Sequence, residues 1–255
     1  MFTYKGLNIG FVLSLAFIAA LLYGIRYLRN RKIRSIPGLE AIDEAVGRAV
    51  ELGRPVHDCP GGGTLIDYTA PQTIAGIALI GYLAKLCAQK GAELMVTINV
   101  AHTLPAIEEI IRTNYLKEGK IEQYSPDIVR FLPDQVSLFS YCMDMFERRR
   151  IAANILVGAY FWEAIVLSEY GGSVGAMQIA GTARQSQLPA FVASCDYLLI
   201  GDEMYASAAK VSDNKAQIGS IAGQDLTRAI VIALMIIAVL AALIGNRDFL
   251  NFLKI

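Results

Sequence analysis

The chain has 255 residues, with 23 basic and 23 acidic side chains, so its formal net charge is zero. This balance provides no overall positive field to attract nucleic acid, and we expect no nucleic-acid partner. Hydrophobic residues make up 55% of the sequence, which is high for a soluble protein and favours membrane-spanning segments.

The first predicted element is a membrane anchor over residues 1–28. Residues 6–25 carry no charge, and at about 1.5 Å per residue such a helix covers a hydrocarbon core of about 30 Å. This run is too long for a cleaved signal peptide, so we expect an uncleaved anchor.

A basic cluster follows the anchor and predicts its orientation. Its five cations are Arg26, Arg29, Arg31, Lys32 and Arg34. Because Lys and Arg in short flanks stay on the cytoplasmic side, the chain that follows is expected in the cytoplasm. The cluster itself is predicted to lie against the lipid headgroups.

Residues 29–54 combine this basic flank with an amphipathic helix. Leu39, Ile42, Val46 and Ala49 recur at helical spacing, and Gly53 ends the pattern. We interpret this helix as a connector that lies between the membrane and the following domain.

Residues 55–214 alternate between short apolar runs and longer helical patterns. The expected strands are 56–59, 64–66, 94–100, 128–132, 154–157, 174–180 and 197–200. The expected helices are 71–89, 105–119, 134–150, 160–170, 185–194 and one that begins at 202. This alternation predicts an α/β, Rossmann-like three-layer domain with a mostly parallel sheet. Residues 68–84 are uncharged, but their glycines and polar residues favour a buried core helix over a third span.

The C-terminal part is predicted to hold a linker (215–228), a second transmembrane helix (229–246) and a short tail (247–255). Residues 229–245 are uncharged, which is enough to span a bilayer. Two spans place both termini outside and the central domain in the cytoplasm.

Ligands of open α/β sheets bind at the carboxyl ends of the strands. The polar and glycine residues that follow the predicted strands are therefore the candidate ligand-binding residues. They are Asn99, His102, Gly181, Thr182, Gly201, Asp202 and Glu203. The sequence specifies no cofactor for them.

Three other patterns have both a functional and a structural interpretation. The turn Gly61–Gly63 resembles a phosphate loop, but it fits neither nucleotide-binding pattern, and a plain glycine turn is favoured. Glu163 lies in an apolar stretch and could be a general acid or base, although a carboxylate at a helix start is favoured. In His57-Asp58-Cys59 the first and third side chains share one face of a strand, which argues against a catalytic cluster.

Cysteine and histidine usage argues against a metal site. Four cysteines are scattered without a C-x-x-C pair, and there are only two histidines. We expect reduced, buried thiols and no metal.

Several segments resemble a family of bacterial and archaeal membrane-anchored proteins described as a domain of unknown function. The segments are AVGRAVELGRPV (45–56), QTIAGIALIGYLAKLCAQKG (72–91), GAMQIAGT (175–182), LPAFVASCDYLLIGDEMYASAAKVS (188–212) and the Gly-Gln-Asp at 223–225. The resemblance implies two transmembrane helices flanking a Rossmann-like domain, at a prokaryotic cytoplasmic membrane. It implies no catalytic residues.

The first functional interpretation is binding and assembly, because no nucleophile, base and oxyanion donor come together in the sequence. It predicts a membrane-anchored homo-oligomeric scaffold, or a subunit of a membrane complex, and leans away from an enzyme. The alternative is an enzyme or sensor that holds a nucleotide or similar small molecule near Thr182, Asp202 and Glu203. A third possibility, a channel or transporter subunit, requires residues 68–84 or 151–167 to span.

Overall fold

The computed structural model describes residues 3–4, 7–30 and 32–243. The chain divides into two compact units. The terminal unit combines Met1–Ile33 with Asp213–Ile255, and the central domain is Arg34–Ser212.

The central domain is built on a six-stranded sheet in which every neighbouring pair is parallel. Its strands are β3 (Val56–Asp58), β4 (Leu94–Ile98), β5 (Val129–Phe131), β6 (Ala153–Val157), β7 (Met177–Thr182) and β8 (Tyr197–Ile200). Their order across the sheet is β5-β4-β3-β6-β7-β8. The prediction of an α/β domain with a parallel sheet is confirmed.

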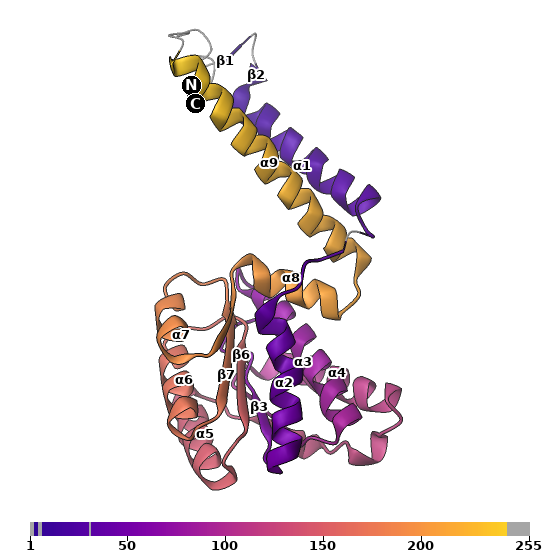
Figure 1. Ribbon diagram of the computed structural model, residues 1–255, viewed down its shortest axis with the longest axis vertical. Coiled ribbons are helices and arrows are strands. Elements are labelled where there is room, and N and C mark those ends of the chain that lie inside the picture. Colours follow the sequence, from indigo (N-terminus) through magenta and orange to yellow (C-terminus); the bar gives the residue numbers. More distant parts are fainter. Residues whose placement is uncertain (1–2, 5–6, 31, 244–255) are drawn as a thin grey trace. The chain divides into compact units, whose positions relative to one another are not determined.

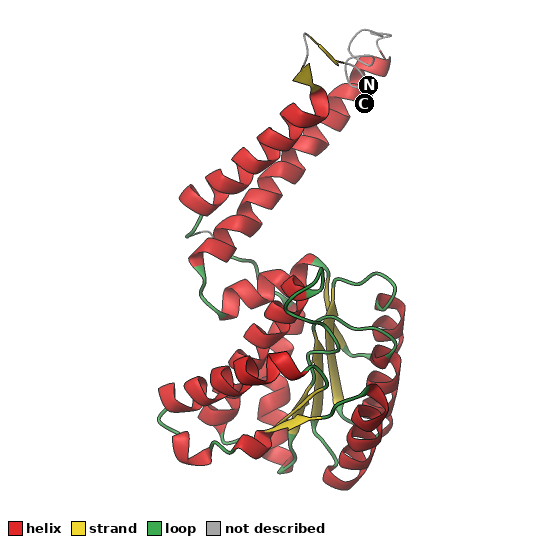
Figure 2. Ribbon diagram, turned by 180° about the vertical axis from the view of Figure 1, so that it is seen from behind, coloured by secondary structure: helices red, strands yellow, loops and turns green. Residues whose placement is uncertain are grey.

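Helices cover both faces of this sheet (Figures 1 and 2). One face carries α2 (Pro37–Leu52), α3 (Ala70–Lys90) and α4 (Leu104–Lys117). The other carries α5 (Gln135–Arg149), α6 (Glu163–Ser173) and α7 (Leu188–Ser194). Helix α8 (Asp202–Val211) packs against α3, and single-turn 3-10 helices occupy Ala101–Thr103, Ile121–Gln123 and Pro126–Ile128. The domain therefore has three layers.

The predicted connector helix is part of the central domain. Helix α2 packs on the sheet, where Ile42, Ala45 and Val46 have no exposed surface. Its apolar face is therefore buried against the strands. The interpretation of this helix as a connector between membrane and domain is wrong.

Other predicted boundaries also differ. Residues 64–66 form a loop with bends and no strand, because the preceding glycines lead into a loop before α3. Helix α6 continues through Gly171 and Gly172 to Ser173. Residues 151–167 comprise strand β6, a loop and the start of α6, so they form no single spanning helix. The predicted linker 215–228 is helical, as the first half of α9 (Lys215–Leu243).

The terminal unit is a pair of helices, α1 (Ile9–Tyr27) and α9, preceded by the short strands β1 (Thr3–Tyr4) and β2 (Leu7–Asn8). The two helices touch through glycines. A Cβ on Gly24 would lie 2.4 Å from the carbonyl oxygen of Gly219, and one on Gly223 would lie 2.9 Å from that of Ala20. Small residues four apart on each helix therefore let the backbones pack closely, as in membrane helix pairs.

Two described helices are apolar and long enough to cross a membrane by length and composition: α3, and α9 over Lys215–Ile237. In α3, 61% of the most apolar 18-residue stretch is buried, so α3 is a core helix of the central domain. In α9 only 11% is buried. The apolar described part of α1, Ser14–Tyr27, is shorter.

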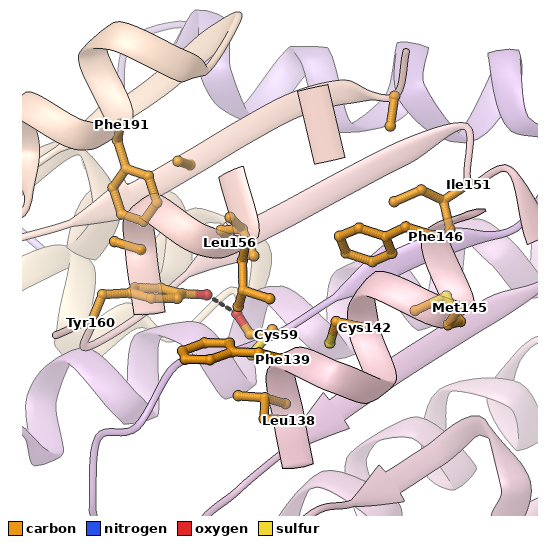
Figure 3. Close-up of a cluster of buried hydrophobic side chains, with 14 residues drawn as sticks. Cys59, Leu138, Phe139, Cys142, Met145, Phe146, Ile151, Leu156, Tyr160 and Phe191 are labelled. Carbon is orange, nitrogen blue, oxygen red and sulfur yellow. Dashed lines mark hydrogen bonds between the residues drawn. The ribbon is translucent and has the colours of Figure 1, made fainter. Parts of the chain in front are cut away.

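A buried apolar cluster lies under α5, α6 and α7 (Figure 3). Phe139, Cys142 and Phe146 project from α5 into it, and Tyr160 packs edge-on against Phe191 with ring centroids 5.1 Å apart. The Tyr160 hydroxyl donates a hydrogen bond to the carbonyl oxygen of Cys59, which joins the loops after β3 and β6.

On the same side, the sheet buries a row of polar side chains, one from each of four adjacent strands. The row consists of Thr97 (β4), His57 (β3), Asn154 (β6) and Gln178 (β7), each at most 2% exposed. The imidazole of His57 contacts Thr97 Oγ1 through Nε2 (2.9 Å) and Asn154 Oδ1 through Nδ1 (2.7 Å). Asn154 Nδ2 then donates to Gln178 Oε1 (2.9 Å). With a proton on Nδ1 only, Nε2 accepts from the Thr97 hydroxyl and every contact in this row pairs a donor with an acceptor.

Burial lowers the pKa of His57 to about 4, against the opposing effect of its hydrogen bond to Asn154. The unfolded chain, with a His pKa of 6.5, then binds more protons than the folded chain between pH 4 and 6.5. The stability that His57 contributes is therefore complete above pH 6.5 and is lost as the pH falls to 4.

We predict that this loss disappears in His57→Gln. Between pH 7 and pH 4 the free energy of unfolding of the native chain should fall relative to the variant by on the order of 3 kcal/mol. Denaturant unfolding of both full-length proteins in detergent at several pH values measures this difference, in which the effects of shared groups such as Asp58 cancel. Parallel pH profiles would show that His57 is not buried in its neutral form.

Candidate functional site

The strand order places a topological switch point between β3 and β6. From these neighbouring strands the chain proceeds in opposite directions across the sheet, to β4 and to β7. Counted along the chain, the order is 3-2-1-4-5-6, which is that of dinucleotide-binding Rossmann domains. Ligands of such sheets bind outside the carboxyl ends of the strands at this point.

The glycine turn after β3 packs tightly against the loop after β6. Gly61 has a φ of +76°, and a Cβ on it would lie 2.4 Å from the carbonyl oxygen of Ala159. A Cβ on Gly63 would lie 2.5 Å from the Cβ of Ala159. Close backbone approach therefore explains these glycines.

The carboxylate of Glu163 bonds the glycine turn whose sequence resembles a phosphate loop. It is fully buried at the start of α6, and its Oε1 accepts a hydrogen bond from the backbone N–H of Gly62 (3.0 Å). Its Oε2 accepts another from Gln135 Nε2 (3.3 Å). Burial raises the pKa of Glu163, while backbone N–H groups and Arg184 partly offset that effect. The carboxylate at the helix start, favoured from the sequence, thus also faces the switch point.

Arg184 and Asn99 each contribute an unpaired polar atom near Glu163 at the switch point. The guanidinium of Arg184, after β7, lies 4.0 Å from the ring centroid of Phe161 and 6.0 Å from that of Tyr68. Its Nη1 and the Oδ1 of Asn99, after β4, are buried without a hydrogen-bond partner in the described part of the chain. The Nδ2 of Asn99 lies 3.7 Å from where a Cβ on Gly62 would be. Unpaired buried atoms of this kind are costly unless a ligand or water completes them.

We call this group the switch-point cluster. It consists of Gly62, Asn99, Gln135, Phe161, Glu163 and Arg184. It provides a carboxylate, an amide and a guanidinium, but its side chains include no hydroxyl or thiol nucleophile. The neighbouring thiol of Cys59 is buried, and burial raises its pKa. The cluster is therefore suited to holding a polar ligand more than to nucleophilic catalysis.

Of the seven predicted ligand-binding residues, Asn99 belongs to the cluster. His102 Nε2 accepts a hydrogen bond from the backbone N–H of Leu65 (3.1 Å), so it orders the neighbouring loop. Thr182 Oγ1 donates to Gln72 Oε1 (3.2 Å), which ties β7 to the start of α3. Gly181 lies inside β7, where a Cβ would meet that of Leu199 at 2.9 Å, so its role is packing.

Gly201, Asp202 and Glu203 lie at the far side of the sheet. They follow β8, which is four strand spacings, or about 19 Å, from β4 and Asn99. Glu203 Oε1 forms an ion pair with Arg34 Nη2 (2.6 Å). The structure therefore does not bring these three residues together with Asn99 and His102.

The basic cluster is partly described. Arg26, Arg29 and Lys32 are exposed, and Arg29 Nε donates to the carbonyl oxygen of Arg26 (3.3 Å). Arg34 is exposed and pairs with Glu203 within the central domain. Arg31 and the tail after residue 243 lie outside the described residues.

The sequence analysis does not identify Gln135 and Arg184, which belong to the cluster, or Gln72, which bonds Thr182. Arg184 had a signal, because it is the only charged residue between Glu169 and Asp196 and it follows a strand end. The two glutamines lie in helices distant in sequence, and only the fold brings Gln135 to Glu163 and Gln72 to Thr182. Among the residues that the structure describes, no three His, Cys, Asp or Glu side chains lie close enough to hold a metal.

Comparison with known families gives a match that covers nearly the whole chain. Residues 1–253 match the family described as Domain of unknown function (DUF6754), and the chain belongs to this family. No curated protein and no solved structure matches it.

Proposed function

We propose that this family member is a membrane-tethered protein whose central domain binds a small polar ligand at the switch-point cluster. One observation carries the proposal. At the strand-order reversal, the buried carboxylate of Glu163 lies beside two side chains, Asn99 and Arg184, that each keep a buried polar atom unpaired.

The chemistry of the cluster restricts the ligand. Asn99 Oδ1 and Glu163 accept hydrogen bonds, whereas Arg184 donates them, so the ligand carries a donor group next to an anionic or acceptor group. The Gly62 N–H that would bind a phosphate already bonds Glu163. Amino acids and hydroxy acids fit this pattern better than a nucleotide whose phosphate occupies the glycine turn. A nucleotide that stacks its base on Tyr68 is the alternative.

The membrane tether is supported by the terminal unit. Its helices pack through Ala20, Gly24, Gly219 and Gly223, while large apolar side chains such as Leu22 (61% exposed) and Met235 (63% exposed) point outward. Outward apolar surface on a glycine-packed helix pair suits hydrocarbon. The basic residues after α1 favour a cytoplasmic central domain with both termini outside, at a prokaryotic cytoplasmic membrane.

A second candidate function is that of a homo-oligomeric scaffold or a subunit of a membrane complex. Four large apolar side chains on loops and helix starts at the carboxyl edge of the sheet are half or more exposed. They are Ile66, Tyr68, Val136 and Trp162. Exposed apolar groups gathered at one edge are typical of interaction sites. A partner protein at this edge would cover the same residues that border the switch-point cluster.

We predict that the full chain, expressed in bacteria, sediments with membranes and stays there after carbonate washing at high pH, because two apolar helices anchor it. Immunoblotting of pellet and supernatant measures this. As a control for orientation, protease added to sealed inside-out vesicles should digest the central domain, and right-side-out vesicles should protect it. Release by carbonate would contradict the tether.

We predict that a ligand of the stated chemistry raises the thermal unfolding temperature of the full chain in detergent. The probes are amino acids, hydroxy acids and nucleotides, each at millimolar concentration. A ligand present at 100 times its Kd stabilises the folded state by about 2.7 kcal/mol. Arg184→Met, which keeps an apolar contact with Phe161 but removes the guanidinium, should abolish the shift.

Arg130→Met is the matched control, because Arg130 also lies over an aromatic ring, that of Tyr141 at 5.9 Å, but outside the cluster. It should keep the full shift. A shift that survives in Arg184→Met, or the absence of any shift across all probes, would contradict ligand binding at the cluster.

A further inference from the structure

The terminal unit has an open groove along α9. Its walls are formed by Phe17 of α1 and by five residues of α9, which are Gln224, Thr227, Arg228, Val231 and Ile232. Residues 224, 228 and 231 recur at spacings of four and three, which places them on one stripe of the helix. Polar side chains line one end of this stripe and apolar side chains the other.

The glycine contacts fix how α1 and α9 align along each other. In this alignment the uncharged stretches of the two helices do not end at the same level. Phe17, which shares the groove with Arg228, lies eight residues, or about 12 Å, inside the end of the uncharged stretch 6–25. The uncharged stretch of α9 begins only at residue 229. If α1 spans the bilayer with its uncharged stretch, then Gln224, Asp225 and Arg228 lie at membrane depth.

Polar groups at membrane depth are costly unless they pair, and they commonly pair between helices. Within the helix, Arg228 Nη1 forms an ion pair with Asp225 Oδ1 at 3.8 Å, and both side chains are more than half exposed. This stretch of α9 therefore carries one positive and one negative group, and its net charge is zero. Such a stretch does not select an anionic lipid headgroup. It is complementary to the same stretch of a second copy, because the cation of each copy can meet the anion of the other.

We propose that a second copy of this chain docks its α9 in the groove. Around a two-fold axis, Gln224 meets the partner's Gln224, and Arg228 pairs with the partner's Asp225. The two-fold arrangement uses the same surface on both copies, as in most homodimers. This inference rests on the proposed membrane tether and would give the homo-oligomer a defined interface.

Disulfide cross-linking in isolated membranes tests the proposal. Gln224→Cys should give a covalent dimer on mild oxidation. The control is Leu226→Cys, because residue 226 lies only about 3 Å further along the helix but about 200° around it. We expect at least a tenfold higher dimer yield for Gln224→Cys than for Leu226→Cys.

Charge exchange in the Gln224→Cys background gives a second readout. Arg228→Asp alone should lower the dimer yield several-fold, because it places like charges together. Adding Asp225→Arg should restore the yield, since the pair is then exchanged but still complementary. A double variant no better than the single one would overturn the pairing.

Equal yields for Gln224→Cys and Leu226→Cys, with the protein in the membrane pellet, would overturn the docking while leaving the tether intact. Protein absent from the pellet would overturn the tether itself. A monomer that retains a phospholipid by native mass spectrometry, and loses it in Arg228→Ala, would show that lipid occupies the groove and would overturn self-docking.

Discussion

The central domain depends on a chain of hydrogen bonds that crosses four strands inside the sheet. Thr97, His57, Asn154 and Gln178 are all buried, and each uses its neighbour to pair its polar atoms. A shift of one strand by one residue would turn a member of this chain to the other face and leave its neighbours unpaired. This row of hydrogen bonds therefore fixes the register of β4, β3, β6 and β7. Gly171 of α6 allows the helix to approach, because a Cβ there would lie 2.6 Å from Asn154 Nδ2.

That register determines which loops meet at the carboxyl edge. The four strands joined by the polar row are the same four that are followed in the chain by Asn99, Gly62, Glu163 and Arg184. Glu163 bonds the glycine turn with its own carboxylate, so the site differs from a phosphate loop although the strand order is that of a dinucleotide-binding domain. Fold and function are separable here, and the proposed ligand follows from the side chains.

Much of the architecture could be predicted from the sequence, because strand and helix periodicities are local. The parallel α/β domain, the buried role of α3 and the helical C-terminal segment follow from such patterns. The position of helix α2 does not follow from its sequence, because an amphipathic pattern is the same whether its apolar face meets a sheet or lipid headgroups. The site is harder to predict from the sequence, because the order of the strands decides which loops are neighbours. Asn99 was expected there, whereas the bond between Gly62 and Glu163 joins residues 101 positions apart.

The central claim is that the switch-point cluster of the central domain holds a small polar ligand. Native mass spectrometry of the full chain, extracted gently from membranes, tests it most directly because it detects a bound small molecule whatever its identity. The account predicts that the protein carries an additional small-molecule mass, and that Glu163→Ala, which removes the buried carboxylate, loses this mass. A chain that carries no additional mass after extraction, or one whose bound mass is unchanged in Glu163→Ala, would contradict the account.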